Sequence, residues 1–158
     1  RMVRRKYPTA KFQLLGFLDV RNSTAVSSIQ MNDWVEEGVV AYLGVSDDVQ
    51  PYLIAADCVV LPSYREGVPR SLLEAAAIGR PIVTTDVTGC RDTVDEGVNG
   101  LLCHVRDAKD LAEKMQRVME MTPNERALMG NAGREKMERE FDEKIVIDCY
   151  LRVIEANT

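Results

Sequence analysis

Apolar residues occur in five short runs along the first two thirds of the chain, and helical or polar segments separate these runs. The runs are continuous rather than alternating, which is typical of strands covered by helices on both faces. They predict strands at residues 11–17, 39–43, 58–61, 81–84 and 100–104. We therefore expect an α/β fold with a mostly parallel sheet.

Helical periodicity fills the intervals between these strands. It predicts helices at residues 27–37, 49–56, 69–78 and 90–95, with turns at Gly38 and Gly79. After His104 the pattern is helical only, and it predicts helices at residues 107–121, 123–140 and 143–156. Asp107 is a plausible N-cap, and the methionine-containing stripe after it is best explained by core packing.

The start of the chain resembles the end of a helix. Residues 1–7 have the pattern of last helical turns, and Pro8 stops them. We therefore expect a fragment of a longer protein, with residues 1–158 forming a single domain.

Composition fits an ordinary soluble domain. The chain has 158 residues, of which 46% are hydrophobic and 28% charged, enough for a core of its own. Its net charge of −5 argues against a general nucleic-acid binder, which usually has a basic face. No apolar run approaches the ~18 residues that span a bilayer, and no signal peptide is evident, so we expect a cytoplasmic protein.

The basic residues at the start offer the main route to a membrane. Arg1, Arg4, Arg5 and Lys6 could attract anionic lipid headgroups, although a solvated helix end is the favoured interpretation. Peripheral contact of the parent protein with the inner membrane face therefore stays open.

Other reactive side chains show no catalytic or metal-binding pattern. The four cysteines lack zinc-like spacing, and we expect reduced, mostly buried thiols beside strands: Cys58, Cys90, Cys103 and Cys149. His104 has no Ser or Cys partner motif and is interpreted as structural. Asp47 and Asp48 are expected to cap the following helix rather than to bind a metal.

The most informative segment is residues 64–75, which joins the strand at 58–61 to the next helix. It places two carboxylates, Glu66 and Glu74, eight positions apart around a turn. Pro69 suits the start of a helix, and the amides of Arg70 and Ser71 can then face an anion. Two acids at this spacing would by themselves favour ordinary surface carboxylates, because the chain holds 25 Asp and Glu.

The surrounding string resembles the Glu-x7-Glu motif of the retaining family 4 glycosyltransferases, which have the two-domain GT-B architecture. The likeness extends over residues 39–44, 55–57, 62–67, 76–86, 89–90 and 97–101. It implies the C-terminal, donor-binding half of such an enzyme: a Rossmann-like parallel sheet with helices on both faces and a helical C-terminal tail. The N-terminal acceptor domain would then precede residue 1.

The resemblance also implies roles for individual residues. It assigns the transferred sugar to Glu66 and Gly67, the diphosphate to Val68, Arg70 and Ser71, the ribose to Glu74, and the nucleobase to Gly44, Val45 and Ser46. Carboxylates suit the sugar and ribose positions because each can accept two hydrogen bonds from a vicinal diol. No residue is assigned as catalytic, because the family's Arg and Lys loop would lie upstream.

The implied function is transfer of a sugar, as in hexosyltransferases, from a UDP-sugar or other NDP-sugar. The acceptor would be a glycan or lipid-linked glycan of surface polysaccharide or lipopolysaccharide synthesis, and no metal or cofactor is expected. This chain alone would bind the donor without turnover. A noncatalytic nucleotide-sugar sensor or partner-binding module is the alternative, whereas a nicotinamide dehydrogenase would need a glycine fingerprint that residues 15–19 lack.

The family resemblance has one further consequence, for the last helix. In such enzymes this helix crosses back to the N-terminal domain. We therefore expect its face with Ile145, Tyr150 and Ile154 to be uncovered in this chain.

Overall fold

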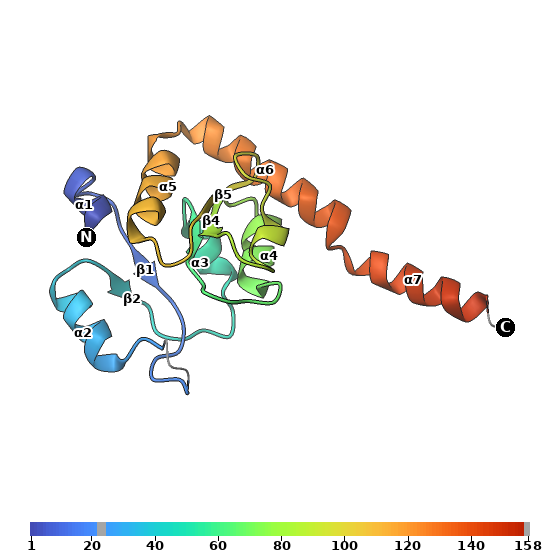
Figure 1. Ribbon diagram of the computed structural model, residues 1–158, viewed down its shortest axis with the longest axis horizontal. Coiled ribbons are helices and arrows are strands. Elements are labelled where there is room, and N and C mark those ends of the chain that lie inside the picture. Colours follow the sequence, from blue (N-terminus) through green and yellow to red (C-terminus); the bar gives the residue numbers. More distant parts are fainter. Residues whose placement is uncertain (22–24, 157–158) are drawn as a thin grey trace. The chain divides into compact units, whose positions relative to one another are not determined.

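A computed structural model describes residues 1–21 and 25–156 of the chain. The chain forms two compact units, Arg1–Val49 and Gln50–Thr158, and each has its own parallel strands. Figure 1 labels the elements along the chain.

Within residues 1–21 and 25–49, the first unit has two helices and one short parallel ladder. Its elements are α1 (Met2–Lys6), β1 (Gln13–Leu14), α2 (Ser28–Glu36) and β2 (Ala41–Tyr42). β1 pairs with β2, with Gln13 opposite Ala41. Ser27 caps α2, since its Oγ accepts a hydrogen bond from the Gln30 amide at 3.2 Å. Both predicted strands are present but shorter than expected.

The basic start of the chain is partly neutralised within this unit. Arg1 Nε lies 2.8 Å from Glu37 Oε2, and both side chains are about half exposed. Among the described residues, no helix combines the length and the apolar character needed to cross a membrane. Membrane contact through these arginines stays a prediction.

The second unit carries the larger sheet. Its elements are α3 (Gln50–Ala55), β3 (Val59–Leu61), α4 (Arg70–Ala77), β4 (Ile82–Thr85), the 3-10 turn η1 (Arg91–Thr93), β5 (Gly100–Cys103), α5 (Ala108–Glu120), α6 (Pro123–Glu140) and α7 (Glu143–Glu155). The strands are parallel in the order β3-β4-β5. Val59 lies opposite Ile82, which lies opposite Gly100.

The helix predicted at residues 90–95 is wrong, because this segment forms only η1. Thr93 Oγ1 donates to the carbonyl of Cys90 at 2.7 Å, and Asn99 Nδ2 donates to the carbonyl of Thr93 at 3.0 Å. These side-chain bonds replace the backbone bonds that a longer helix would make.

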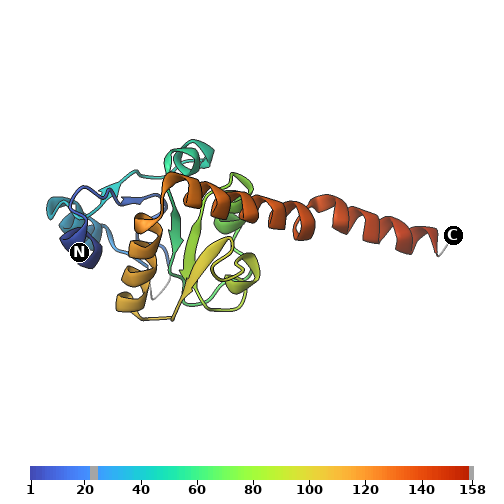
Figure 2. The same ribbon diagram turned by 90° about the horizontal axis from the view of Figure 1, so that it is seen from above.

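Helices cover both faces of β3–β5, as predicted. The core of one face includes Leu72 of α4 with Ile82, whereas the core of the other includes Val118 of α5 with Val83. Adjacent residues of β4 therefore point into different cores. Figure 2 shows α4 and α5 on opposite sides of these strands. The stripe after Asp107 packs in the second core, as expected, and Asp107 caps α5.

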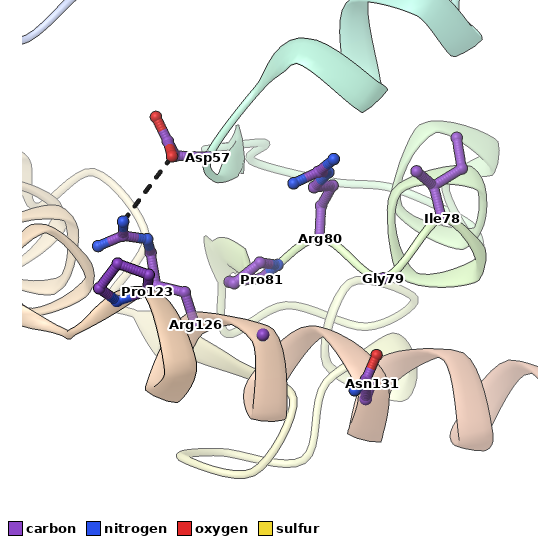
Figure 3. Close-up of a pocket in the computed structure, with 9 residues that line it drawn as sticks. Asp57, Ile78, Gly79, Arg80, Pro81, Pro123, Arg126 and Asn131 are labelled. Atoms are coloured by element: carbon purple, nitrogen blue, oxygen red, sulfur yellow. Dashed lines mark ion pairs between the residues drawn. The ribbon is translucent and has the colours of Figure 1, made fainter.

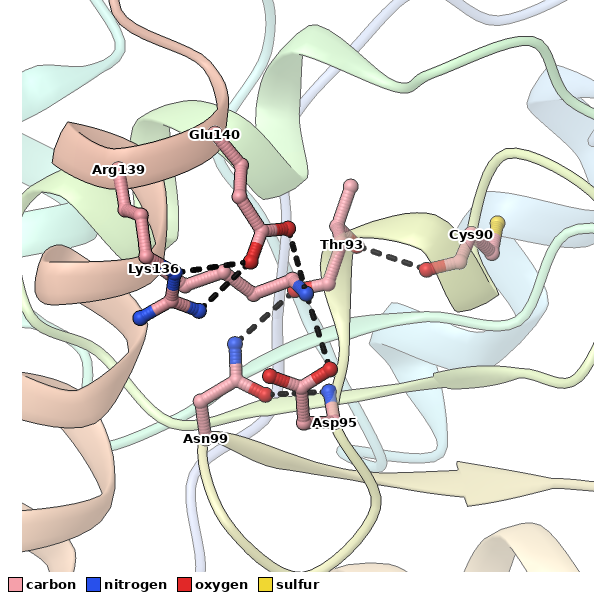
Figure 4. Close-up of polar contacts among 7 residues, drawn as sticks. All are labelled: Cys90, Thr93, Asp95, Asn99, Lys136, Arg139 and Glu140. Atoms are coloured by element: carbon pink, nitrogen blue, oxygen red, sulfur yellow. Dashed lines mark hydrogen bonds and ion pairs between the residues drawn. The ribbon is translucent and has the colours of Figure 1, made fainter.

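A buried polar network attaches α6 to the loop before β5 (Figure 4). Lys136 is 6% exposed, and its Nζ lies 2.9 Å from Asp95 Oδ1 and 2.8 Å from Glu140 Oε2. Burial alone would lower the pKa of Lys136, but the hydrogen bonds that its ammonium donates to Glu140 and Asp95 raise this pKa overall. Asn99, also buried, accepts from the Asp95 amide at 2.7 Å. The loop is therefore held by charge and hydrogen bonding as well as by apolar contacts.

α7 presents apolar side chains to solvent. Residues 143–156 are all exposed, and Ile145, Tyr150 and Ile154 are 41%, 69% and 61% exposed. The uncovered face expected for this helix is confirmed.

The cysteines are free thiols, as predicted. Cys90 and Cys103 are buried and Cys58 partly so, but Cys149 on α7 is exposed. Burial, with a smaller effect of Asp57, raises the pKa of Cys58 to about 12.

Candidate functional site

Three loops follow the carboxyl ends of β3, β4 and β5. Carboxyl ends of parallel strands meet at one edge, where ligands of α/β folds collect. Two threonines of β4 fasten the first loop: Thr84 Oγ1 donates to the Leu61 carbonyl at 2.7 Å, and Thr85 Oγ1 donates to the Ser63 carbonyl. The chain entering residues 64–69 is therefore tied to the middle strand of the sheet.

The second loop packs directly on the turn that holds Glu66. Gly89 has φ +82°, and a Cβ there would lie 1.6 Å from the Gly67 oxygen and 2.9 Å from the Glu66 oxygen. Only glycine permits this approach of two backbones. A side-chain bond joins the two ends of this loop, since Arg91 Nε donates to Asp86 Oδ1 at 2.7 Å. Residues 86–91 thus form a firm support beneath Glu66 and Gly67.

Glu66 itself is exposed and oriented by a neighbour. Ser63 Oγ donates to its Oε1 at 2.8 Å, which leaves the second carboxylate oxygen to accept bonds from other donors. Gly67 has open space where a side chain would begin, so protein packing does not require glycine there. The amides and carboxylate of this turn are accessible at the edge of the sheet.

α4 begins directly after this turn. Pro69 occupies the N-cap with ψ 120°, one residue earlier than a position inside the first turn, and its carbonyl accepts from Leu72 and Leu73 at 3.0 and 3.2 Å. As the first residues of the helix, Arg70 and Ser71 have amides with no carbonyl four positions earlier in the helix. Glu74 lies one turn further along. The residues predicted to bind the sugar, the diphosphate and the ribose therefore follow one another along a single turn and the first turns of α4.

The two charged side chains of α4 pair with each other. Arg70 Nη2 lies 3.6 Å from Glu74 Oε1, and the side chains are 91% and 34% exposed. Such an exposed i,i+4 pair contributes only about 0.3–0.5 kcal/mol, so a ligand can displace it at small cost. The Arg70 side chain points to solvent, and the backbone amide is the better candidate for diphosphate contact.

The third loop adds a cation that the sequence did not indicate. Arg106, after β5, has its guanidinium 5.2 Å from the centre of the Tyr64 ring, within cation–π range. It also has φ +60°, which is uncommon for a residue with a side chain. No local pattern around Arg106 marks it, because the contact joins residues far apart in sequence.

His104, in the same loop, is fixed to the start of α5. Its amide donates to Asp110 Oδ2 at 2.7 Å, and its Nδ1 lies 2.6 Å from the same oxygen. The hydrogen bond from the His104 amide, aided by the ring, lowers the pKa of Asp110. These contacts agree with a structural role for His104.

The predicted nucleobase residues belong to the first unit. Gly44 has φ +78°, and its carbonyl accepts from the Gly16 amide at 2.9 Å. Ser46 Oγ donates to the Asp48 carbonyl at 2.7 Å, while Val45 is 48% exposed. They form a turn after β2, and their contact with a nucleobase stays a prediction.

Metal binding has no structural support within residues 1–21 and 25–156. No cluster of three or more His, Cys, Asp or Glu side chains is placed there to hold an ion. The metal independence implied by the resemblance stays a prediction.

Parallel strands with helices on both faces, and with the Glu66 turn and the start of α4 at their carboxyl ends, define an α/β unit of the Rossmann-like class. Comparison with known families agrees with this class: residues 1–121 match the family described as glycosyl transferases group 1. The chain belongs to that family.

Individual relatives and solved structures point the same way. The chain is 35% identical over 144 residues to N,N'-diacetylbacillosaminyl-diphospho-undecaprenol alpha-1,3-N-acetylgalactosaminyltransferase of Campylobacter jejuni, covering 91% of the chain and 36% of the relative. It is 31% identical over 140 residues to the capsular polysaccharide biosynthesis glycosyltransferase CapM of Staphylococcus aureus, covering 86% and 35%. The S. aureus TarM G117R mutant, solved with Fondaparinux, alpha-GlcNAc-glycerol and UDP, superposes with a TM-score of 0.82 at 24% identity, covering 96% and 30%. This likeness confirms the fold.

The chain spans little more than a third of the length of these relatives. The family and fold class predicted from residues 39–101 are confirmed. The roles of single residues are not tested by these likenesses.

Proposed function

We propose that the chain is the donor-binding domain of a retaining glycosyltransferase of the hexosyltransferase type. The donor is a UDP-sugar or another NDP-sugar, and the acceptor is a glycan or lipid-linked glycan of surface-polysaccharide or lipopolysaccharide synthesis. The observation that carries the proposal is the backbone contact of Gly89 with Gly67, which fixes the Glu66 turn next to the free amides of α4. The names of two relatives support the acceptor class. One is an N-acetylgalactosaminyltransferase whose name includes a diphospho-undecaprenol compound, and the other is a glycosyltransferase of capsular polysaccharide biosynthesis.

Each part of the turn suits one part of the donor. The free oxygen of Glu66 accepts hydrogen bonds from hydroxyls of the transferred sugar, beside Gly67. The amides of Val68, Arg70 and Ser71 face the diphosphate. Glu74, released from Arg70, binds the ribose diol with charge-assisted bonds. The nucleobase contacts the turn formed by Gly44, Val45 and Ser46 in this proposal.

The helix start does not supply enough charge for turnover. A helix N-terminus stabilises an anion by only about 0.3–2 kcal/mol, whereas a departing nucleoside diphosphate needs strong cationic compensation. In this proposal the remaining cations and the acceptor domain come from the rest of the protein. The 158-residue chain therefore binds the donor without transferring the sugar, and the whole protein works in the cytoplasm, in contact with the inner membrane face where lipid-linked acceptors lie.

An NMR titration of the 158-residue chain with UDP tests the proposal. We expect saturable shifts of the Gly67, Ser71 and Glu74 amides, with a dissociation constant of about 1 mM, equivalent to about 4 kcal/mol. Glu74→Gln should weaken UDP binding at least several-fold, since it removes the charged acceptor. Glu135→Gln, an exposed change on α6, serves as the matched control and should leave the affinity unchanged.

Sugar dependence and turnover need separate measurements. Glu66→Gln should reduce the affinity for a UDP-sugar but not for UDP. The absence of saturable shifts near Glu66, Ser71 and Glu74 at several millimolar UDP would refute the binding proposal. If the full-length protein binds UDP-sugars but releases nucleotide from none of a panel, the transferase proposal fails and the noncatalytic sensor replaces it.

A further inference from the structure

A pocket lies at the opposite edge of the β3–β4–β5 sheet from the Glu66 turn. It is a cavity of about 310 Å³, formed by Asp57 ahead of β3, the α4–β4 turn and the first half of α6. Asp57 and Pro81 precede β3 and β4, so the cavity faces the amino ends of parallel strands, whereas the Glu66 turn follows a carboxyl end. The two sites are therefore distinct.

Two arginines dominate the walls of this cavity (Figure 3). In Figure 3 the side chains of Arg80 and Arg126 extend to the same side of α6, with Pro81 between them. Arg80 Nη2 donates to the Ile54 carbonyl at 2.6 Å, and Arg126 Nη1 donates to the Met121 carbonyl at 2.6 Å. The backbone thus holds both guanidinium groups in place, which preorganises them for a ligand.

The positive charge in the cavity exceeds what its one carboxylate compensates. Arg126 Nη2 lies 3.9 Å from Asp57 Oδ1; the Arg126 side chain is only 23% exposed, but that of Asp57 is 88% exposed. Such a long, solvated pair is weak. Arg80 Nε is buried and has no hydrogen-bond acceptor within the described parts of the chain. Among the described residues, Arg80 bonds to the Ile54 carbonyl and pairs with no carboxylate, so its charge is not compensated by the protein.

We propose that this cavity is a binding site for phosphate, either free or as the monoester group of a small metabolite. Guanidinium groups match the geometry of phosphate oxygens, and a dianion would compensate the charges of Arg80 and Arg126 together. The cavity volume lies at the small end of ligand sites, which suits a phosphate monoester and excludes a dinucleotide. Asn131, exposed on the rim, offers an amide donor.

The backbone contacts around the cavity keep its shape. A Cβ on Gly130 would lie 1.9 Å from the Gly79 oxygen, so α6 rests directly on the α4–β4 turn. The distance between α6 and the α4–β4 turn is therefore fixed by direct backbone contact on this side of the cavity.

An NMR titration of the 158-residue chain with inorganic phosphate, at an ionic strength held constant with NaCl, tests the proposal. We expect saturable shifts at Gly79, Arg80 and Asn131. Arg126→Gln should weaken binding at least tenfold. Asn131→Asp changes an exposed side chain, so the fold is kept, and its added negative charge should also weaken binding severalfold.

Controls separate this cavity from the other anion-ready feature of the chain. Ser71→Pro removes an amide at the start of α4 and should leave the phosphate shifts at Gly79 unchanged. A parallel titration with glycerol phosphate distinguishes the two sources: tighter binding than inorganic phosphate assigns the site to a monoester, and weaker binding assigns it to the free ion. No saturable shift at Gly79 and Arg80 with up to 50 mM of either probe, about the limit of weak binding, or equal shifts in wild type and Asn131→Asp, would overturn the proposal.

Discussion

The contact of Gly89 with the Glu66–Gly67 peptide can be tested by adding one methyl group. Gly89→Ala introduces a Cβ at 1.6 Å from the Gly67 oxygen, although real Cβ atoms essentially never approach a heavy atom within 3.0 Å. The turn must move by more than an ångström, and overpacking of this kind costs about 1–3 kcal/mol. The left-handed φ of +82° adds about 1–2 kcal/mol for a residue with a side chain. We expect the free energy of unfolding to fall by about 2–5 kcal/mol in total.

Gly97→Ala provides a matched control. Gly97 has φ +77°, almost the same conformation, but nothing lies within 4 Å of the position of its Cβ. The free energy of unfolding of Gly97→Ala should therefore fall only by the cost of the left-handed φ, about 1–2 kcal/mol. The difference between the two variants isolates the backbone contact from the cost of the turn conformation.

Urea unfolding followed by circular dichroism gives both values, provided that the dependence on urea is the same in each variant. UDP titration then adds a functional measurement: affinity should fall in Gly89→Ala and stay at the wild-type value in Gly97→Ala. Equal losses of stability in the two variants would show that Gly89 is needed for its conformation alone, and the support beneath Glu66 would not exist.

Three further predictions concern the rest of the second unit. Lys136→Ala should lower the free energy of unfolding by about 1–2 kcal/mol in urea titrations, and Lys136→Met by about half as much because it keeps the packed stem; equal effects would contradict a packing role for the stem. Because the folded pKa of Asp110 is lowered, its contribution to stability is present above the ordinary value of about 3.9 and is lost as the pH falls through the folded pKa. Wild type should therefore lose stability more steeply than Asp110→Asn below about pH 4, and parallel curves would refute this. With iodoacetamide at pH 8, peptide mass spectrometry should find Cys149 alkylated first and Cys58 protected by burial and its raised pKa; comparable rates would indicate that β3 opens readily.

The sequence located the strands because their apolar runs are continuous, a consequence of burial on both faces. Val83 and Ile82 illustrate this, since adjacent residues serve different cores. The helix expected at 90–95 failed because Thr93 and Asn99 make side-chain bonds to the backbone, which depend on where β5 lies. Local periodicity contains no information about such bonds.

The sequence could predict only the part of the site that comes from one continuous segment. The order of Glu66, Gly67 and the start of α4 follows from one continuous segment, so sequence motifs could indicate it. The support from Gly89 and the cation at Arg106 come from other strand ends, and nothing around either residue marks its distant partner. The arginine cavity was missed for the same reason, since Arg80 and Arg126 line one cavity only when α6 lies on the α4–β4 turn.

The contact between Gly89 and Gly67 also limits how the Glu66 turn can rearrange when a ligand binds. Backbone already occupies the side of Glu66 and Gly67 that faces residue 89, so these two residues cannot move closer to it. A donor held by Glu66 therefore meets a turn that cannot retreat toward residues 86–91.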